Sequence, residues 1–287
     1  MKIQPVILAE GLRKSSFESL VGVPPQLLPM APSVSLLACW YEKLAEITDD
    51  LPPLEIMVSS SQGYQSMDVL SADPRFKRVI DPRPHRGTGG VLADYLKRRE
   101  SAHEDLDYLF VIERSSCPPR SLRSFFRNLE SNPDVLIGVS ELDRLVGIMA
   151  IKPRVLKLVP EVGYFDLKEQ AVDKAVQCGL SVTAAVIMSR AIQVRSLRGW
   201  LDAIRYLNLT ESSSGEPVSY SAHGTNCIDP GARIGEAVIL DSIVMKDATV
   251  ENGAIIARSV LCPGAHVASG AQVIDSIIGR SKRAMRS

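Results

Sequence analysis

Short apolar runs alternate with segments of helical periodicity in the part of the chain that precedes residue 210. The apolar runs predict buried strands at residues 6–9, 54–58, 108–112, 135–139 and 148–151. The periodic segments predict helices at residues 35–47, 89–100, 121–130 and 166–178. The last of these ends at Gly179, a favoured helix stop. Because strands that alternate with helices usually form parallel sheets covered on both faces, the pattern predicts an α/β fold with a mainly parallel sheet.

A repeat begins near His223. Residues 241–244 recur as residues 258–261 and again as residues 275–278, with an offset of 17 residues each time. Aliphatic side chains recur every five or six positions, at Ile228, Ile234, Val244, Val250, Ile256, Leu261, Val267 and Val273. This period fits a coil with three short sides that each turn one aliphatic side chain inward, so it predicts a parallel β-helix of about three coils. We expect its open end coils to pack on the first domain or on another chain.

The polar segment between the two patterns has the composition of a linker. We therefore divide the chain into an α/β domain (1–209), a linker (210–222), a β-helix (223–280) and a basic tail (281–287).

Composition excludes several classes of function. The 33 basic and 33 acidic residues cancel, so no general attraction for nucleic acid or anionic membranes is expected. No apolar run is long enough for a membrane-spanning helix, and the apolar stretch near the start is too short for a signal peptide. The five cysteines and four histidines are scattered without metal-ligand spacing, which favours reduced thiols in the cytoplasm.

Six motifs add a family resemblance. They lie at residues 6–15, 22–29, 87–92, 147–156, 166–169 and 200–202. With an α/β domain followed by a β-helix, the chain resembles the sugar-phosphate nucleotidyltransferases, above all the mannose-1-phosphate guanylyltransferases and their glucose-1-phosphate relatives. The resemblance covers nearly the whole chain. It implies a Rossmann-like sheet of the nucleotide-diphospho-sugar transferase type and a left-handed β-helix of hexapeptide repeats.

The resemblance also implies a site. It places nucleotide-binding positions at Ala9, Glu10, Gly11, Arg13, Lys14, Gly87, Gly89 and Gly90. In the family, backbone N–H groups of the glycine-rich loop approach the nucleotide phosphates. Asp202 matches a family aspartate that binds the metal, and Glu113 is a second candidate for catalysis. An active member would use Mg²⁺ as its cofactor.

Several positions depart from the family. Glu10 replaces a loop glycine, and its carboxylate would repel a triphosphate by about 1–4 kcal/mol at ~4 Å. Ser15 replaces the loop arginine, Pro25 the phosphate-binding lysine and Ser115 a metal-binding aspartate. Residues 141–144 leave no room for the family's sugar-binding hairpin. Because losing one charge-stabilising group commonly costs about 10²–10³-fold in rate, ordinary transferase activity is not expected.

Three functions stay open. The first is a catalytically impaired regulatory or scaffolding subunit of nucleotide-sugar metabolism, which binds a nucleotide or nucleotide sugar. It would form a homo-oligomer, or a hetero-oligomer with an active homologue, through its β-helix. The second is a diverged active enzyme that makes a nucleoside diphosphate sugar and recruits Arg13, Lys14, Glu113 and Asp202. The third is a β-helix acyltransferase that uses His266, although His266 shares its repeat column with the solvent-facing Thr249.

Simpler explanations compete at the individual positions. The glycines between residues 87 and 90 also suit a plain turn. Asp202 also suits a helix cap or a surface acid, and the basic segment 82–86 also suits a rigid exposed loop.

Overall fold

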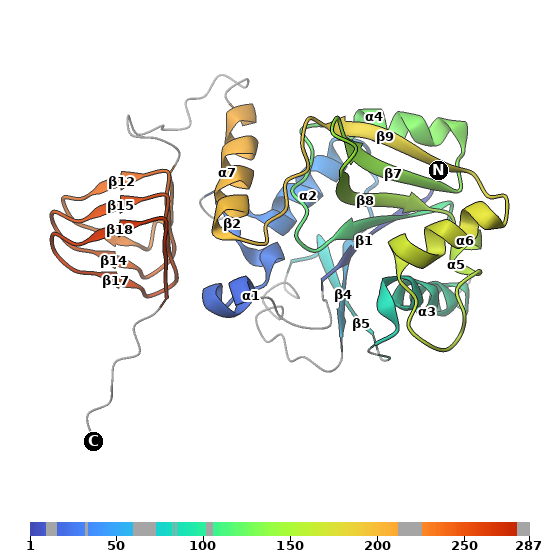
Figure 1. Cartoon of the computed structure of the whole chain (residues 1–287), viewed down its shortest axis with the longest axis horizontal. Coiled ribbons are helices and arrows are strands. Elements are labelled where there is room, and N and C mark those ends of the chain that lie inside the picture. Colours follow the sequence, from blue (N-terminus) through green and yellow to red (C-terminus); the bar gives the residue numbers. More distant parts are fainter. Residues whose placement is uncertain are drawn as a thin grey trace. The chain divides into compact units, whose positions relative to one another are not determined.

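The computed structural model describes residues 1–9, 16–31, 34–59, 73–81, 83, 85–101, 106–211 and 226–279 (Figure 1). Two compact units divide the chain. The first contains Met1–Arg13 and Trp40–Ala191, and the second contains Lys14–Cys39 and Ile192–Ser287. The sequence-based division at residue 209 follows the order of the chain, whereas the compact units follow its contacts. The segment Lys14–Cys39 therefore belongs to the same unit as the β-helix.

A seven-stranded sheet forms the centre of the first unit. Its strands are β1 (Ile3–Leu8), β4 (Leu54–Ser59), β5 (Phe76–Asp81), β6 (Tyr108–Glu113), β7 (Val135–Ser140), β8 (Leu145–Ile151) and β9 (Val182–Met188). Their order is β5-β4-β1-β6-β8-β7-β9. Only β8 runs antiparallel to its neighbours, which confirms the predicted mainly parallel sheet. The two edge strands β5 and β9 were not predicted from the sequence. The exposed Lys77 and Arg78 interrupt the apolar pattern of β5, whereas β9 contains an apolar run at residues 184–188 that was overlooked.

Helices cover both faces of this sheet. They are α2 (Leu36–Ala45), α3 (Gly87–Ser101), α4 (Arg123–Asn128), α5 (Pro153–Leu156), the π-helical turn η4 (Leu167–Ala171) and α6 (Val172–Gln177) (Figure 1). Leu109 and Val111 of β6 pack in one cluster with buried residues of α3, α5, η4 and α6. Phe110, which points to the other face, contacts Trp40 of α2 and Phe125 of α4 with ring centroids 6.5 and 5.5 Å apart. The alternation along β6 explains why its whole run is apolar.

The C-terminal part of the second unit is a three-sided parallel β-helix. Its strands are β10 (Cys227–Ile228), β11 (Arg233–Ile234), β12 (Val238–Leu240), β13 (Ile243–Val244), β14 (Thr249–Val250), β15 (Ile255–Ala257), β16 (Val260–Leu261), β17 (His266–Val267), β18 (Gln272–Ile274) and β19 (Ile277–Ile278). They form three parallel stacks, β10-β13-β16-β19, β11-β14-β17 and β12-β15-β18. Ile243 pairs with Val260 and Val260 with Ile277, at the predicted offset of 17 residues.

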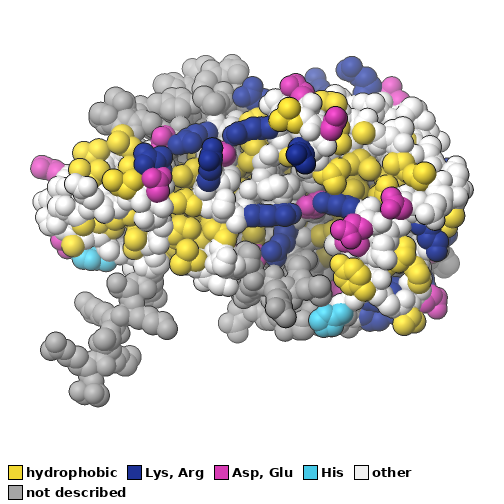
Figure 2. Space-filling view, in the orientation of Figure 1, with side chains coloured by type: hydrophobic (Ala, Val, Ile, Leu, Met, Phe, Trp, Pro, Cys, Tyr) yellow, Lys and Arg dark blue, Asp and Glu magenta, His cyan; other side chains and the backbone are white. Residues whose placement is uncertain are grey.

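Most of the predicted inward positions of the β-helix are confirmed. Val244, Val250, Ile256 and Leu261 belong to its buried core. Ile234 is the exception, with 37% of its surface exposed, because it lies in the first coil and has no coil beyond it. Hydrophobic side chains also reach the surface of the β-helix in Figure 2.

The rest of the second unit consists of elements from segment 14–39 and the helix that precedes the β-helix in the sequence. It contains α1 (Ser16–Val21), a short 3₁₀ turn η1 (Pro25–Leu27), β2 (Pro29–Ala31), β3 (Val34–Ser35) and α7 (Leu197–Glu211). The buried ring of Trp200 on α7 donates its N–H to the carbonyl of Pro29 at 2.9 Å. It meets Phe17 edge-on, with centroids 6.2 Å apart. Trp200, which lies in the motif at residues 200–202, is thus a packing residue of this unit. No helix in the described ranges is long and apolar enough to span a membrane.

Candidate functional site

The candidate site of the first unit lies at the carboxyl ends of its parallel strands. Leu8, the last residue of β1, pairs with Met57 of β4 on one side and with Glu113 of β6 on the other. Ligands of open α/β sheets bind outside the carboxyl ends of strands, where the strand order reverses, and β1 occupies that position here. Ala9 follows β1 directly, is buried and donates its N–H to the carbonyl of Met57 at 3.1 Å.

The glycine motif forms the first turn of α3. Gly87 has a φ of +73°, and a Cβ there would lie 2.6 Å from the carbonyl oxygen of Phe165. The N–H groups of Gly89 and Gly90 donate to this same oxygen, at 2.9 and 3.2 Å. The N–H of Phe165 donates to the carbonyl of Arg86 at 2.8 Å. First-turn N–H groups are the usual anion donors of a helix, and these two donate to the protein's own backbone instead.

Asp166 connects the glycine turn to η4. Its Oδ1 accepts the N–H groups of Lys168 and Glu169 at 2.8 and 3.0 Å, as an N-cap does. Its Oδ2 accepts the hydroxyl of Thr88 at 3.0 Å, and that hydroxyl accepts the N–H of Leu167 at 2.9 Å. The motif at residues 166–169 therefore fixes the turn that lies against the glycines.

Glu113 and Lys168 form an ion pair at the end of β6. Their side chains are 19% and 35% exposed, so the pair is partly shielded from water. Ser115, at the position where the resemblance places a metal-binding aspartate, is fully buried. Trp40 donates its ring N–H to the carbonyl of Ser116 at 2.8 Å and fixes this turn. These residues do not fit a magnesium site, because the carboxylate of Glu113 at the end of β6 already faces an ammonium group and Ser115 is enclosed.

The basic residues before the glycine motif are engaged within the protein. Arg86 is buried and donates to the carbonyls of Gly163 and Pro160, both at 2.7 Å. Arg83 forms an ion pair with Asp94. Both guanidinium groups thus hold neighbouring backbone and helix α3 in place.

The structure does not bring all candidate residues together. The predicted nucleotide-binding residues Glu10, Gly11, Arg13 and Lys14 lie outside the described residues. Asp202 belongs to the second unit, on α7, and its Oδ1 lies 3.7 Å from Nη1 of Arg205. Across the described ranges, no group of three or more His, Cys, Asp or Glu side chains is arranged to hold a metal ion.

His266 lies on β17 opposite Thr249, as the repeat predicted. It is about half exposed, and its Nε2 lies 2.9 Å from Oε1 of Glu251. Glu251 also accepts the N–H of Ser269 at 2.9 Å. The imidazole is therefore held by a carboxylate on the neighbouring coil.

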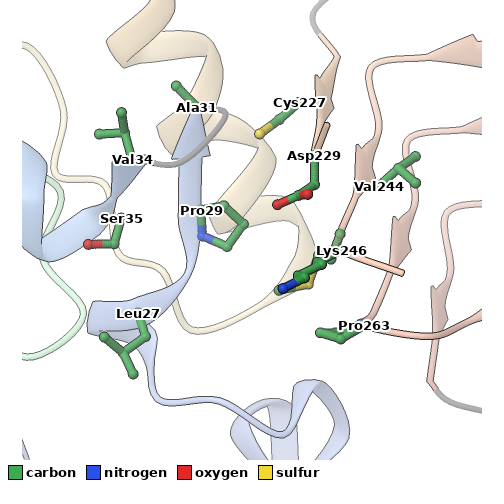
Figure 3. Close-up of a pocket in the computed structure, with 11 residues that line it drawn as sticks. Leu27, Pro29, Ala31, Val34, Ser35, Cys227, Asp229, Val244, Lys246 and Pro263 are labelled. Carbon is green, nitrogen blue, oxygen red and sulfur yellow. The ribbon is translucent and has the colours of Figure 1, made fainter. Parts of the chain in front are cut away.

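A pocket of about 250 Å³ in the second unit was not predicted (Figure 3). Its lining residues are Leu27, Pro29, Ala31, Val34, Ser35, Cys227, Asp229, Val244, Met245, Lys246 and Pro263. The sequence gives no signal for it, because its two walls, residues 27–35 and 227–263, are distant along the chain. Burial raises the pKa of the Cys227 thiol to about 12 and that of the Cys262 thiol to about 11. Both thiols are protonated at neutral pH and are weak nucleophiles.

Comparison with known proteins finds a likeness to solved structures. No protein-family model matches the chain, and no curated protein matches it significantly. Among solved structures, HddC from Yersinia pseudotuberculosis is similar, with a TM-score of 0.52 and 15% sequence identity. The similarity covers 72% of this chain and 100% of HddC. At this identity the likeness shows a shared fold.

Proposed function

We propose that this chain is a nucleotidyltransferase-like protein of nucleotide-sugar metabolism that has lost ordinary transferase activity and acts as a regulatory or scaffolding subunit. The carrying observation is the glycine turn of α3, where Gly89 and Gly90 donate their N–H groups to the carbonyl of Phe165. A phosphate would have to displace that carbonyl to reach the same donors. The Glu113–Lys168 pair supports the same proposal, because phosphoryl-type transfer depends on positive charge aimed at the phosphates.

A pyrophosphate-release assay tests the loss of activity. The purified full chain is incubated with each nucleoside triphosphate, a panel of hexose 1-phosphates and Mg²⁺. We expect no release above the rate without protein, and robust turnover with any pair would refute the proposal. Calorimetric titration with nucleoside triphosphates and nucleotide sugars, with and without Mg²⁺, then measures whether binding persists without catalysis.

The proposed scaffolding role requires association, which we place on the β-helix. Its surface exposes apolar side chains such as Val238 and Ile274, which are 48% and 46% exposed. Size-exclusion chromatography with light scattering is expected to show a dimer or larger species, alone or with an active homologue. Val238→Glu and Ile274→Glu should shift it towards the monomer, and a protein that is monomeric under all these conditions would refute this role.

A diverged active transferase is the second candidate. It is favoured by the position of Glu113, the last residue of β6, which pairs with Leu8 at the end of β1. In that case Glu113→Gln and Asp202→Ala should each abolish pyrophosphate release, and an unchanged rate would remove the residue from the reaction. A Lys174→Met variant of α6 is the surface control.

A further inference from the structure

The pocket of the second unit combines an apolar lining with two opposite charges. One wall is mostly apolar and consists of Leu27, Pro29, Ala31, Val34 and the polar Ser35. The other wall belongs to the β-helix and carries Asp229 and Lys246, whose charged ends point toward Pro29 in Figure 3. Pockets of this kind bind ligands by hydrophobic contact and use a few polar groups to fix orientation.

Asp229 and Lys246 each have a charged group that can bind a ligand. Oδ1 of Asp229 accepts the N–H of Gly231 at 2.8 Å, which leaves Oδ2 available. Among the residues that the structure describes, neither side chain forms an ion pair, with the other or with a third residue. A carboxylate and an ammonium group therefore face one cavity without neutralising each other.

Hydrogen bonds within the β-helix fix the backbone of Asp229 and Lys246. The N–H of Asp229 donates to the carbonyl of Val244 at 2.8 Å, and the N–H of Gly264 donates to the carbonyl of Lys246 at 3.1 Å. Asp229 directly follows β10, and Lys246 lies two positions after β13, the neighbouring strand of the same stack. The two residues therefore belong to successive coils, whose strands lie about 4.8 Å apart.

We propose that this pocket binds a small zwitterion with an apolar side chain, a free α-amino acid of the leucine or methionine class. Its carboxylate pairs with Lys246 and its ammonium group with Asp229, while its side chain lies against Leu27, Ala31 and Val34. A simple anion would leave Asp229 unpaired, and a simple cation would leave Lys246 unpaired. A cavity of 150 Å³ holds benzene, so about 250 Å³ holds about ten non-hydrogen atoms, the size of leucine. This site does not depend on the proposed nucleotide-sugar function.

Isothermal titration calorimetry of the full chain tests the proposal with four probes. L-leucine and L-methionine carry both charges, 3-methylbutylamine lacks the carboxylate, and 4-methylpentanoate lacks the ammonium group. We expect saturable binding of the two amino acids and at least about tenfold weaker binding of each single-charge analogue, because each analogue loses one charge-assisted hydrogen bond. No saturable heat from either amino acid, or equal affinity for an analogue, would overturn the proposal.

Two variants separate the charges. Lys246→Met should weaken leucine binding at least about tenfold and leave 3-methylbutylamine binding unchanged. Asp229→Asn, which keeps an oxygen for the N–H of Gly231, should weaken leucine equally and leave 4-methylpentanoate unchanged. Lys174→Met, at an exposed lysine of α6, is the matched control and should bind leucine like the natural chain. Unchanged leucine affinity in both pocket variants, with native circular dichroism, would refute the assignment.

Discussion

Glu113 and Lys168 neutralise each other at the end of β6, and Phe165 supplies the acceptor for the N–H groups of Gly89 and Gly90. At the residue scale, these groups are therefore engaged by contacts within the protein. A nucleotide would compete with a backbone carbonyl and an ammonium group that are already in place. The close approach of the Phe165 carbonyl also explains why the helix needs glycine at position 87, whether or not a ligand binds.

Gly87→Ala tests that requirement. Gly87 and Gly179 share a φ of +73°, but a Cβ meets the Phe165 carbonyl at 2.6 Å in Gly87 and nothing within 4 Å in Gly179. Gly179→Ala should cost about 1–2 kcal/mol from backbone strain alone. Gly87→Ala should cost about 1–3 kcal/mol more, because the added methyl group clashes with backbone. Urea denaturation measures the free energy of unfolding of both variants. Equal losses would mean that the backbone at Phe165 moves away from the added methyl group without cost.

Asp134 should make the stability of the first unit depend on pH. It is buried, and burial alone would raise its pKa, but hydrogen bonds from Arg154 and Ser181 lower the pKa below the usual value. A folded-state pKa below the unfolded value means that the stabilisation is complete above about pH 4 and is lost as pH falls through the folded pKa.

Asp134→Asn should therefore lower the denaturation midpoint at pH 7, and the difference from the natural chain should shrink as pH falls below about 4. Asp173→Asn, at an exposed position of α6, is the control and should leave the midpoint unchanged. A difference that stays constant from pH 7 to pH 3 would contradict this role for Asp134.

At the scale of elements, hydrogen bonds between the turns of successive coils stabilise the β-helix in addition to its aliphatic core. The hydroxyl of Ser242 accepts the N–H of Ser259 at 3.0 Å, and the hydroxyl of Ser259 accepts the N–H of Ser276 at 3.1 Å. The preceding residues, Asp241, Arg258 and Asp275, have φ values of +47°, +48° and +49°. The serine of each coil thus satisfies a donor of the next coil, which explains why this column repeats in the sequence.

Ser259→Ala should destabilise the β-helix by about 1–3 kcal/mol, because the N–H of Ser276 loses its acceptor. Ser276→Ala is the control, since the Ser276 hydroxyl bonds only the carbonyl of Ile274 among the described residues, and it should cost about 0.5 kcal/mol or less. Equal losses of unfolding free energy for the two variants would show that the hydrogen bonds between serines of successive coils do not stabilise the β-helix.

At the scale of the whole molecule, each compact unit has a hydrophobic core of its own. One cluster joins the central sheet to α3 and α6, and another fills the β-helix. The two tryptophans of the chain report on them separately, because Trp40 belongs to the first unit and Trp200 to the second. Unfolding of such a chain need not be a single two-state transition.

We expect the fluorescence midpoint of Trp200 in a Trp40→Phe variant to differ from that of Trp40 in a Trp200→Phe variant. Circular dichroism of the natural chain should then show a transition that spans both midpoints. Coincident midpoints for all three measurements would show that the units unfold as one cooperative body.

The candidate site was less predictable than the fold. The sequence patterns placed Glu113 at the end of the strand that became β6 and the glycines of residues 87–90 at the start of a helix, because the ends of strands and helices follow from short local patterns. The partners Phe165 and Lys168 could not be predicted, since they come from a segment more than 50 positions along the chain. The catalytic roles of Glu113 and Asp202 stay predictions.

The sequence by itself determined the mainly parallel sheet and the three-sided β-helix. The runs at residues 54–58 and 108–112 and the 17-residue repeat are local patterns, and side-chain burial within one element reads directly from such patterns. Only the tertiary structure decided which charges meet, as with Glu113 and Lys168, and that residues 27–35 and 227–263 enclose a pocket. Contacts between distant segments depend on how the helices and strands pack together in three dimensions, and local sequence patterns do not specify that packing.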